Sequence, residues 1–193
     1  KAKHAQAVLT EQIGLAEREL EYLSSVQDAL ARAETERDFA ELRQELTVAG
    51  LCGDRRAPKN GKKGGRPLPS KPLAFTLTSG RTVRVGKNNL QNDALTFGAD
   101  KTDIWFHVKG FPGSHAVLFT DGAEPTDLDY TESAMLAAYH SKASGGVNVQ
   151  VDYTPVRYVK KPAGAKPGFV VYDRYFTAVV RAALPDGVRE QKK

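Results

Sequence analysis

Residues 103–115 read Asp103-Ile104-Trp105-Phe106-His107-Val108-Lys109-Gly110-Phe111-Pro112-Gly113-Ser114-His115, which predicts a strand, a turn rich in Gly and Pro, and a second strand. Side chains alternate across a strand, so two sets face opposite sides of a sheet. The apolar set predicts the core face: Ile104, Phe106 and Val108. The other set combines an aromatic ring, an imidazole and an amine, which suit phosphates and bases: Trp105, His107 and Lys109. We expect the turn to bring Ser114 and His115 back beside this second face, so that the segment presents a binding surface.

Composition limits the classes of protein to consider. With 193 residues, 40% of them hydrophobic, the chain can form one folded domain plus an appendage. The one cysteine, Cys52, excludes a disulfide framework and fits a reducing, cytoplasmic compartment. No apolar run approaches the roughly 18 residues that a membrane helix needs, so we expect no membrane partner. Because the first residue is Lys rather than Met, we expect a fragment of a longer protein.

Charge is divided unevenly along the chain. Residues 1–50 contain six Lys or Arg against ten Asp or Glu, a net charge of −4. The remaining residues contain twenty-two basic against thirteen acidic side chains, a net charge of +9. A basic domain favours polyanions such as nucleic acid, although the same excess also occurs in proteins that merely stay in solution.

The first fifty residues predict a helical arm made of helices 3–33 and 36–49. Thr35 and Asp38 are typical of a capping box that starts the second helix. In the first helix, alternating spacings of four and three define the seam of a coiled coil, with one polar member: Leu9, Ile13, Ala16, Leu20, Leu23, Gln27 and Leu30. The seam favours pairing with a partner helix from another part of the same protein. The alternative is a helical hairpin packed on its own domain.

Residues 51–72 are rich in Gly, Pro, Lys and Arg and predict a basic flexible linker, which either grips phosphates or acts as a solvated spacer. Beyond it, short strands are predicted at 74–77, 82–85, 104–109, 115–119, 147–153, 156–159, 169–172 and 176–181. Two helices are predicted at 88–96 and 130–143, the second capped by Asp129 with Glu132 as its box partner. Hairpin-length connections predominate, so we expect an α+β domain with a mainly antiparallel sheet over residues 73–185, followed by a frayed tail at 186–193.

Two more segments carry candidate nucleic-acid contacts. Within residues 152–168, cations alternate with tyrosines in a frame of Pro and Gly that leaves backbone N–H groups free for phosphate: Arg157, Lys160, Lys161 and Lys166, with Tyr153 and Tyr158. The alternative is protection of a strand edge against aggregation. At the start of helix 88–96, amide and carboxylate side chains exceed what capping requires, and a helix N-terminus also binds phosphate: Lys87, Asn88, Asn89, Asn92 and Asp93. For Asn88 itself a capping role is the simpler interpretation.

A self-contained catalytic site is not indicated. The histidines, at 4, 107, 115 and 140, lack metal-ligand spacing, and no motif surrounds Cys52. The sequence has neither of the common Gly-rich nucleotide-binding motifs. We therefore expect a binding module rather than an enzyme, without metal or cofactor. A site built on His107 and His115 around an unknown substrate is a distant alternative.

Four segments occur in the order expected of an NFACT-R domain: residues 88–93, 103–115, 137–143 and 152–168. Over about residues 73–181 the chain resembles this RNA-binding module of the RqcH/NEMF family, whose bacterial members were formerly called fibronectin-binding proteins. The preceding helices resemble part of the same family's coiled-coil and middle region. Phe111, Ala116 and Pro155 depart from the expected pattern at packing positions only.

This resemblance implies a ribosome-associated quality-control factor. Its implied partners are the obstructed large ribosomal subunit, rRNA and tRNA, alanyl-tRNA in particular. The implied activity is support of C-terminal alanine tailing of stalled nascent chains, which we do not expect from this chain alone because the family's N-terminal domains are absent from it. The alternative function is that of a surface adhesin that binds a host extracellular-matrix protein such as fibronectin.

Overall fold

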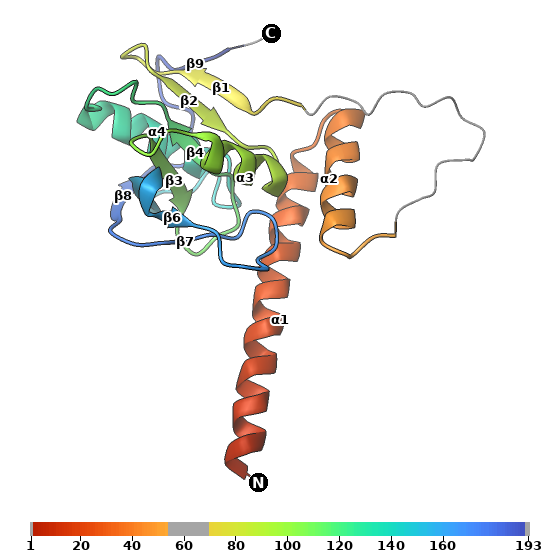
Figure 1. The fold of residues 1–193 in the computed structure, drawn as a ribbon. Coiled ribbons are helices and arrows are strands. Elements are labelled where there is room, and N and C mark those ends of the chain that lie inside the picture. Colours follow the sequence, from red (N-terminus) through yellow and green to blue (C-terminus); the bar gives the residue numbers. More distant parts are fainter. Residues whose placement is uncertain (1, 54–69, 192–193) are drawn as a thin grey trace, which may run out of the picture.

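A seven-stranded antiparallel sheet forms the body of the protein (Figure 1). The structure is a computed structural model, and it describes residues 2–53 and 70–191. In chain order the strands are β1 (Leu73–Thr76), β2 (Thr82–Val85), β3 (Ile104–Val108), β4 (Ala116–Leu118), β5 (Val149–Pro155), β6 (Val159–Lys160), β7 (Val171–Tyr172), β8 (Phe176–Val180) and β9 (Arg189–Glu190). The sheet order is β8-β5-β3-β4-β2-β1-β9, while β6 pairs with β7 as a separate ribbon.

The strand that the sequence singles out, β3, lies in the middle of the sheet. It pairs antiparallel with β4, where Trp105 lies opposite Val117, and with β5, where His107 lies opposite Asp152. The remaining strand pairs of this sheet are antiparallel as well. The predicted α+β class with a mainly antiparallel sheet is therefore confirmed.

Helices cover both faces of this sheet. Helix α4 (Asp127–Tyr139) packs on one face, where the alternate residues of β3 enter the main core: Ile104, Phe106 and Val108. Helix α3 (Asn89–Gly98) lies on the opposite face and contributes Leu95 to a second, smaller core. The second core decides the environment of Trp105, as described below.

Three local predictions are wrong. Helix α4 begins three residues earlier than predicted, because the capping box is formed by Thr126 and Asp129, whose side chains each accept the other residue's backbone N–H. Glu132 instead accepts hydrogen bonds from Thr78. Residues 156–158 form a 3-10 turn instead of a strand. In the tail that was expected to fray, β9 pairs with β1, because the edge of a sheet offers unpaired backbone groups.

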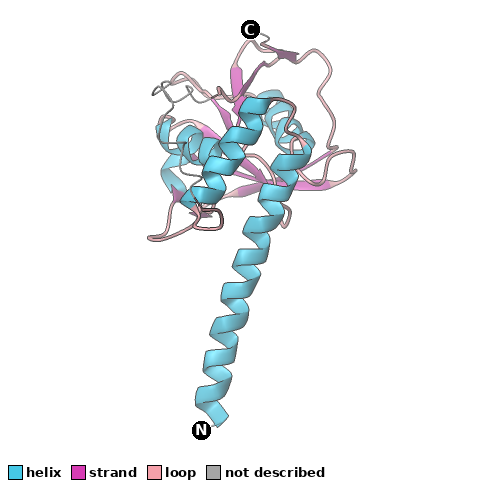
Figure 2. Cartoon of the chain, turned by 90° about the vertical axis from the view of Figure 1, so that its right-hand side faces the viewer, coloured by secondary structure: helices cyan, strands magenta, loops and turns pink. Residues whose placement is uncertain are grey.

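The arm consists of α1 (Ala2–Ala31) and α2 (Glu36–Val48), which lie side by side at the domain end of α1 (Figure 2). Both predicted helices and the Thr35–Asp38 capping box are confirmed. Tyr22, Val26 and Ala29 are buried, whereas the predicted seam residues are all exposed. The N-terminal half of α1 projects away from the sheet domain (Figure 1). The predicted linker lies mostly outside the described residues.

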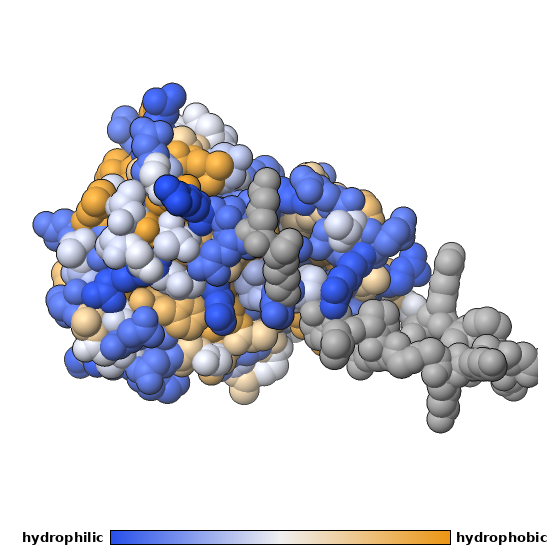
Figure 3. Space-filling model, turned by 90° about the horizontal axis from the view of Figure 1, so that it is seen from above, coloured by the Kyte–Doolittle hydropathy of each residue, from blue (hydrophilic) through white to orange (hydrophobic). Residues whose placement is uncertain are grey.

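The surface carries both hydrophilic and hydrophobic side chains. Seen from above, apolar areas show between hydrophilic ones over the sheet domain (Figure 3). Within the described part of the chain, no helix combines the length and the hydrophobicity that crossing a bilayer requires.

Candidate nucleic-acid interface

Trp105 is a core residue, so the prediction that its face of β3 is exposed is wrong for this side chain. The ring is 0% exposed and packs in the second core with apolar residues from α3, β4, β6 and the 3-10 turn: Leu95, Val117, Val156 and Val159. The alternation itself is as predicted. The error arose because α3 and the segment from the 3-10 turn to β7 cover the second face of the sheet as well.

The two histidines of the quoted stretch join Trp105 in an aromatic cluster. Trp105 and His107 are nearly parallel, with ring centroids 5.8 Å apart, and His115 meets Trp105 edge-on at 5.2 Å. The ring of Tyr172 lies 4.8 Å from Trp105. His115 is buried, and its Nδ1 lies 2.8 Å from the hydroxyl of Thr96. Of the two histidines, only His107 keeps part of its surface open.

Burial keeps both of these histidines neutral. Desolvation lowers the pKa of His107 from 6.5 to about 4, although Asp152 acts in the opposite direction. Desolvation also holds the pKa of His115 well below its usual value, and the neighbouring His107 adds to the effect. Neither ring therefore offers a positive charge to a phosphate near pH 7. Each ring instead has one N–H donor and one lone-pair acceptor.

We expect acid to destabilise the protein well above the titration range of its carboxylates. Burial also lowers the pKa of His140 to about 4, with a contribution from Arg32. Unfolded histidine binds a proton below about pH 6.5, whereas these native rings do so only near pH 4, so their contribution to stability is complete above pH 6.5 and is lost as the pH falls. Between pH 7 and pH 5, each ring should cost about 1–2 kcal/mol in the free energy of unfolding, measured by chemical denaturation. The variant His107→Phe should lose less stability than the unaltered protein over this pH range. If both proteins show the same pH dependence, the lowered pKa of His107 is contradicted.

The amide cluster at the start of α3 binds the arm. Asn89 donates its backbone N–H to Glu45 Oε2 at 2.9 Å and its side-chain Nδ2 to Glu45 Oε1 at 2.8 Å. The same Nδ2 donates to Ser25 of α1 at 2.7 Å. Asn88 caps α3 by accepting the Gln91 N–H, as the simpler interpretation predicted. The helix N-terminus that was expected to hold phosphate thus holds a carboxylate of the same chain.

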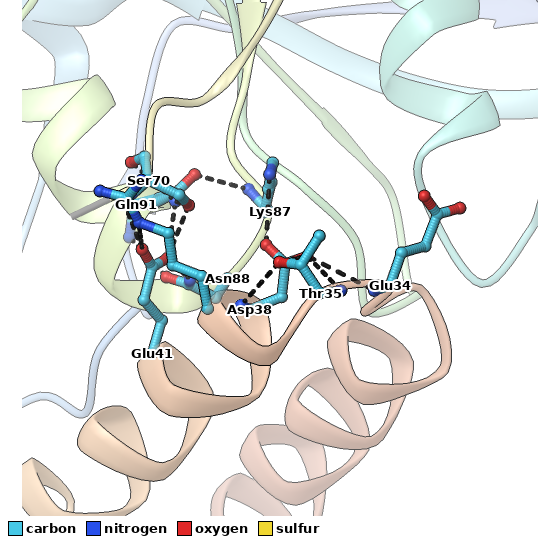
Figure 4. Close-up of polar contacts among 9 residues, drawn as sticks. Glu34, Thr35, Asp38, Glu41, Ser70, Lys87, Asn88 and Gln91 are labelled. Carbon is cyan, nitrogen blue, oxygen red and sulfur yellow. Dashed lines mark hydrogen bonds and ion pairs between the residues drawn. The ribbon is translucent and has the colours of Figure 1, made fainter. Parts of the chain in front are cut away.

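Figure 4 shows the outer part of this contact between α2 and the segment that leads into α3. Asn88 Nδ2 donates to Glu41 at 3.0 Å, and Lys87 Nζ forms an ion pair with Asp38 at 3.2 Å. Nearby, Asn92 Oδ1 accepts the backbone N–H of His115 at 3.0 Å. Four of the residues predicted to contact RNA from this segment are therefore engaged by other parts of the chain: Lys87, Asn88, Asn89 and Asn92.

The Pro- and Gly-rich loop is also tied down. Asp93 pairs with Lys161 and accepts the backbone N–H of Gly168 at 3.2 Å. Gly168 has φ +80°, and a Cβ there would overlap the Asn89 side chain, so the loop needs Gly at this close approach. Lys166 pairs with Glu19 of α1 at 3.3 Å, and its amine lies 4.9 Å from the centroid of the Tyr22 ring.

Ser114 is also buried, and its hydroxyl accepts a hydrogen bond from Arg32 at 3.0 Å. Lys109 remains exposed, 3.9 Å from Asp152 and 5.4 Å from the centroid of the Tyr175 ring. Across residues 2–53 and 70–191, no group of three or more His, Cys, Asp and Glu side chains is arranged to hold a metal ion.

An exposed basic cluster lies on the 3-10 turn, β6 and the segment after β7, and we call Arg157, Lys160, Arg174 and Tyr158 the basic cluster. The guanidinium groups of Arg157 and Arg174 lie 5.1 and 5.2 Å from the centroid of the Tyr158 ring. The two groups, Arg174 foremost, lower the pKa of the Tyr158 hydroxyl. The Lys160 side chain is 69% exposed, with only an exposed partner, Asp173, at 3.8 Å. Sequence reasoning missed Arg174, because nothing in its local pattern shows that the turn before β8 comes back beside Tyr158.

Comparison with known proteins decides the family. Residues 71–173 match the sequence model of the NFACT protein RNA binding domain, which is more than half of the chain. The chain belongs to this family. The predicted resemblance is thereby confirmed. The matched region contains α3, the aromatic cluster and most of the basic cluster, whose remaining member, Arg174, follows directly after it.

Named relatives extend the likeness to the arm of this NFACT protein. The Rqc2 homolog RqcH of Bacillus subtilis (strain 168) is 45% identical over 183 residues, which are 93% of this chain and 31% of the relative. The Rqc2 homolog RqcH of Streptococcus suis (strain 05ZYH33) is 42% identical over 174 residues, 89% of this chain and 30% of that protein. The chain thus spans less than a third of the length of these relatives.

A solved structure shares the arrangement of arm and NFACT domain. It is the C-terminal part of the fibronectin/fibrinogen-binding protein from Streptococcus suis, 40% identical in sequence, with a TM-score of 0.81. The superposition covers 94% of this chain and 70% of that one. A fit of this extent includes the helices as well as the sheet.

Proposed function

We propose that this chain is the RNA-binding part of a ribosome-associated quality-control factor and that it grips RNA mainly through phosphates. The observation that carries the proposal is the basic cluster on a domain of the NFACT RNA-binding family. Two guanidinium groups lie beside one phenol ring and are exposed to solvent, so both charges are accessible to a phosphate. Arg in such a setting binds phosphate through a planar fork of N–H donors.

The bound RNA is proposed to be that of a large ribosomal subunit obstructed by peptidyl-tRNA, together with tRNA. The relatives are named as Rqc2 homologs, which supports a place in ribosome quality control. Alanyl-tRNA recruitment and alanine tailing are proposed only for a longer protein that contains this chain. We propose a binding role for the chain itself, in agreement with its family, rather than a catalytic one.

Neutralising the basic cluster should weaken binding to structured RNA. In the variant Arg157→Gln/Lys160→Gln/Arg174→Gln, three charges that face solvent are lost, while stability should change by less than about 0.5 kcal/mol per site. Each lost phosphate contact should reduce the slope of log affinity against log salt by about 0.7 to 0.9. Fluorescence anisotropy of a labelled tRNA at several salt concentrations measures both quantities.

A matched variant separates the basic cluster from net charge. Arg37→Gln/Lys87→Gln/Lys161→Gln also removes three charges, but these cations pair with Glu41, Asp38 and Asp93. We expect this variant to lose less RNA affinity than the first. Equal losses would show that only net charge matters, and an affinity independent of salt would exclude phosphate binding altogether.

The seam of α1 supports a second, structural proposal. Its large apolar members are exposed along one helix, which suits pairing with another helix of a longer form of the protein: Leu9, Ile13, Leu20, Leu23 and Leu30. In such a longer form, a cysteine introduced at position 13 should cross-link to a cysteine on the partner helix; no cross-link would contradict the pairing.

The alternative function, that of an adhesin, has one observation in its favour. The structural relative from Streptococcus suis is named a fibronectin/fibrinogen-binding protein. The same anisotropy experiment with labelled fibronectin fragments in place of tRNA distinguishes the two functions. Binding of fibronectin without binding of RNA would favour the adhesin.

A further inference from the structure

An open cavity of about 740 Å³ lies between α1 and the NFACT domain, and no role has been given to it so far. Its walls are the α1 face around Tyr22, the turn at residues 110–113 and the loop at residues 162–170. Its aromatic lining includes the partly open rings of His107, Phe169 and Tyr172 and the buried rings of Trp105 and His115. Its charged lining residues are two cations, Arg18 and Lys166, and two carboxylates, Glu19 and Glu21. Its volume falls within the roughly 300 to 1,000 Å³ of sites that enclose small ligands.

The chemistry of the aromatic lining suits a flat, uncharged ring. The two imidazoles are neutral near pH 7, so these two rings attract neither an anion nor a cation strongly. His107 is partly open. The influences on its pKa are burial and the charge of Asp152, with no hydrogen bond to the ring among the described residues. Another lining residue, Trp105, carries a buried Nε1 that has no hydrogen-bond partner among the described residues. Polar groups left unpaired in this way favour a ligand or a rearrangement that satisfies them.

The two cations of the lining, Arg18 and Lys166, suit a phosphate. Lys166 pairs with Glu19, but both side chains are partly exposed, at 33% and 52%, and such surface ion pairs contribute little to stability. A phosphate can therefore compete with Glu19 for the amine. The loop that carries Lys166 is held in place by the contacts of Asp93 with Lys161 and Gly168. The cation is thus presented at low ordering cost.

We propose that this cavity accepts one unstacked nucleobase of bound RNA, with its neighbouring phosphate at Lys166 and Arg18. The inference rests on the proposed RNA-binding function and assigns a second, distinct contact to it. A base has an aromatic face that stacks on side-chain rings and an edge of donors and acceptors that neutral imidazole matches. A cavity of about 740 Å³ has room for a single nucleotide and not for a stretch of double helix. The ligand is therefore a single-stranded, looped or bulged segment.

Intrinsic fluorescence and abasic RNA test the proposal on the intact chain. Trp105 is the only tryptophan, so its emission reports on the cavity without any label. A single-stranded oligonucleotide should change this emission as it binds, and removal of its central bases should weaken binding about five- to a hundredfold, the range for one stacked base. Anisotropy of the labelled oligonucleotide measures the affinity independently of Trp105.

A conservative variant tests the imidazole. His107→Phe keeps a ring against Trp105 and removes both nitrogens, so affinity for the intact oligonucleotide should fall about three- to tenfold while affinity for the abasic one stays the same. His4→Phe, on the exposed N-terminal part of α1, is the matched control and should change neither. If His107→Phe does not fold, the comparison of intact and abasic oligonucleotides on the unaltered chain still decides.

The outcomes separate this inference from RNA binding as such. Tight binding with unchanged Trp105 emission and equal affinity for the abasic oligonucleotide would overturn the base site and leave phosphate binding intact. An emission change that persists with abasic RNA would also overturn it, because phosphate alone would then reach the cavity. Absence of any RNA binding would overturn the proposed function and this inference together. Displacement of the oligonucleotide by an unrelated peptide, with no preference for intact bases, would assign the cavity to a protein ligand instead.

Discussion

Replacement of Trp105 with alanine should lower the free energy of unfolding by about 3–5 kcal/mol, the cost typical of truncating a fully buried large aromatic side chain. The ring is 0% exposed and contacts apolar residues from several elements, so its removal leaves a cavity that the sheet and α3 cannot easily fill. Denaturant-induced unfolding followed by far-ultraviolet circular dichroism measures the effect without relying on tryptophan emission.

A second aromatic substitution serves as the control for Trp105. Phe176 on the edge strand β8 is 66% exposed, and Phe176→Ala should cost less than about 1 kcal/mol. If Trp105→Ala instead unfolds like the unaltered protein and loses only RNA affinity, the ring contacts RNA at the surface and does not belong to the second core.

Replacement of Glu45 with alanine should cost about 2–4 kcal/mol and release the arm from the domain. Its carboxylate is 0% exposed and accepts two hydrogen bonds from Asn89 at the N-terminus of α3. Burial raises the pKa of this carboxyl, while the Asn89 hydrogen bonds act in the opposite direction. Alanine would leave the buried Asn89 backbone N–H without an acceptor and its side-chain amide with Ser25 as its only acceptor among the described residues. Chemical denaturation measures the loss, and hydrogen exchange along α2 shows whether the arm has come away.

Glu19→Ala is the control for Glu45. Glu19 also pairs across the boundary between arm and domain, with Lys166, but its side chain is 52% exposed, so the change should cost under about 1 kcal/mol. If the two substitutions lower the free energy of unfolding equally, the buried hydrogen bonds of Glu45 do not hold the arm on the domain.

Much of the architecture follows from local sequence. Helix 36–48 begins at a capping box that is predictable from Thr35 and Asp38. In β3, side chains alternate between the two faces of the sheet, as they do in every strand. The antiparallel sheet follows from short connections, because parallel neighbours need long crossovers. The family is also readable from the sequence, because its segments recur in a fixed order within residues 71–173.

The site was less predictable, because residue type does not reveal the partner of a polar group. Asn89 and Lys166 suit phosphate by their chemistry, yet both contact glutamates of the arm that are far from them in sequence. Arg174 joins Arg157 at Tyr158 only because the chain returns after β7.

For this protein, the sequence by itself determined where most helices and strands form, which side of β3 enters the main core, and which family the domain belongs to. These properties depend on neighbours a few residues apart. Only the tertiary structure decided that Trp105 is buried, that α2 supplies a carboxylate to the N-terminus of α3, and that a cavity lies between α1 and the domain. Those properties depend on which segments cover the second face of the sheet, and burial is set by contacts between segments distant in the chain.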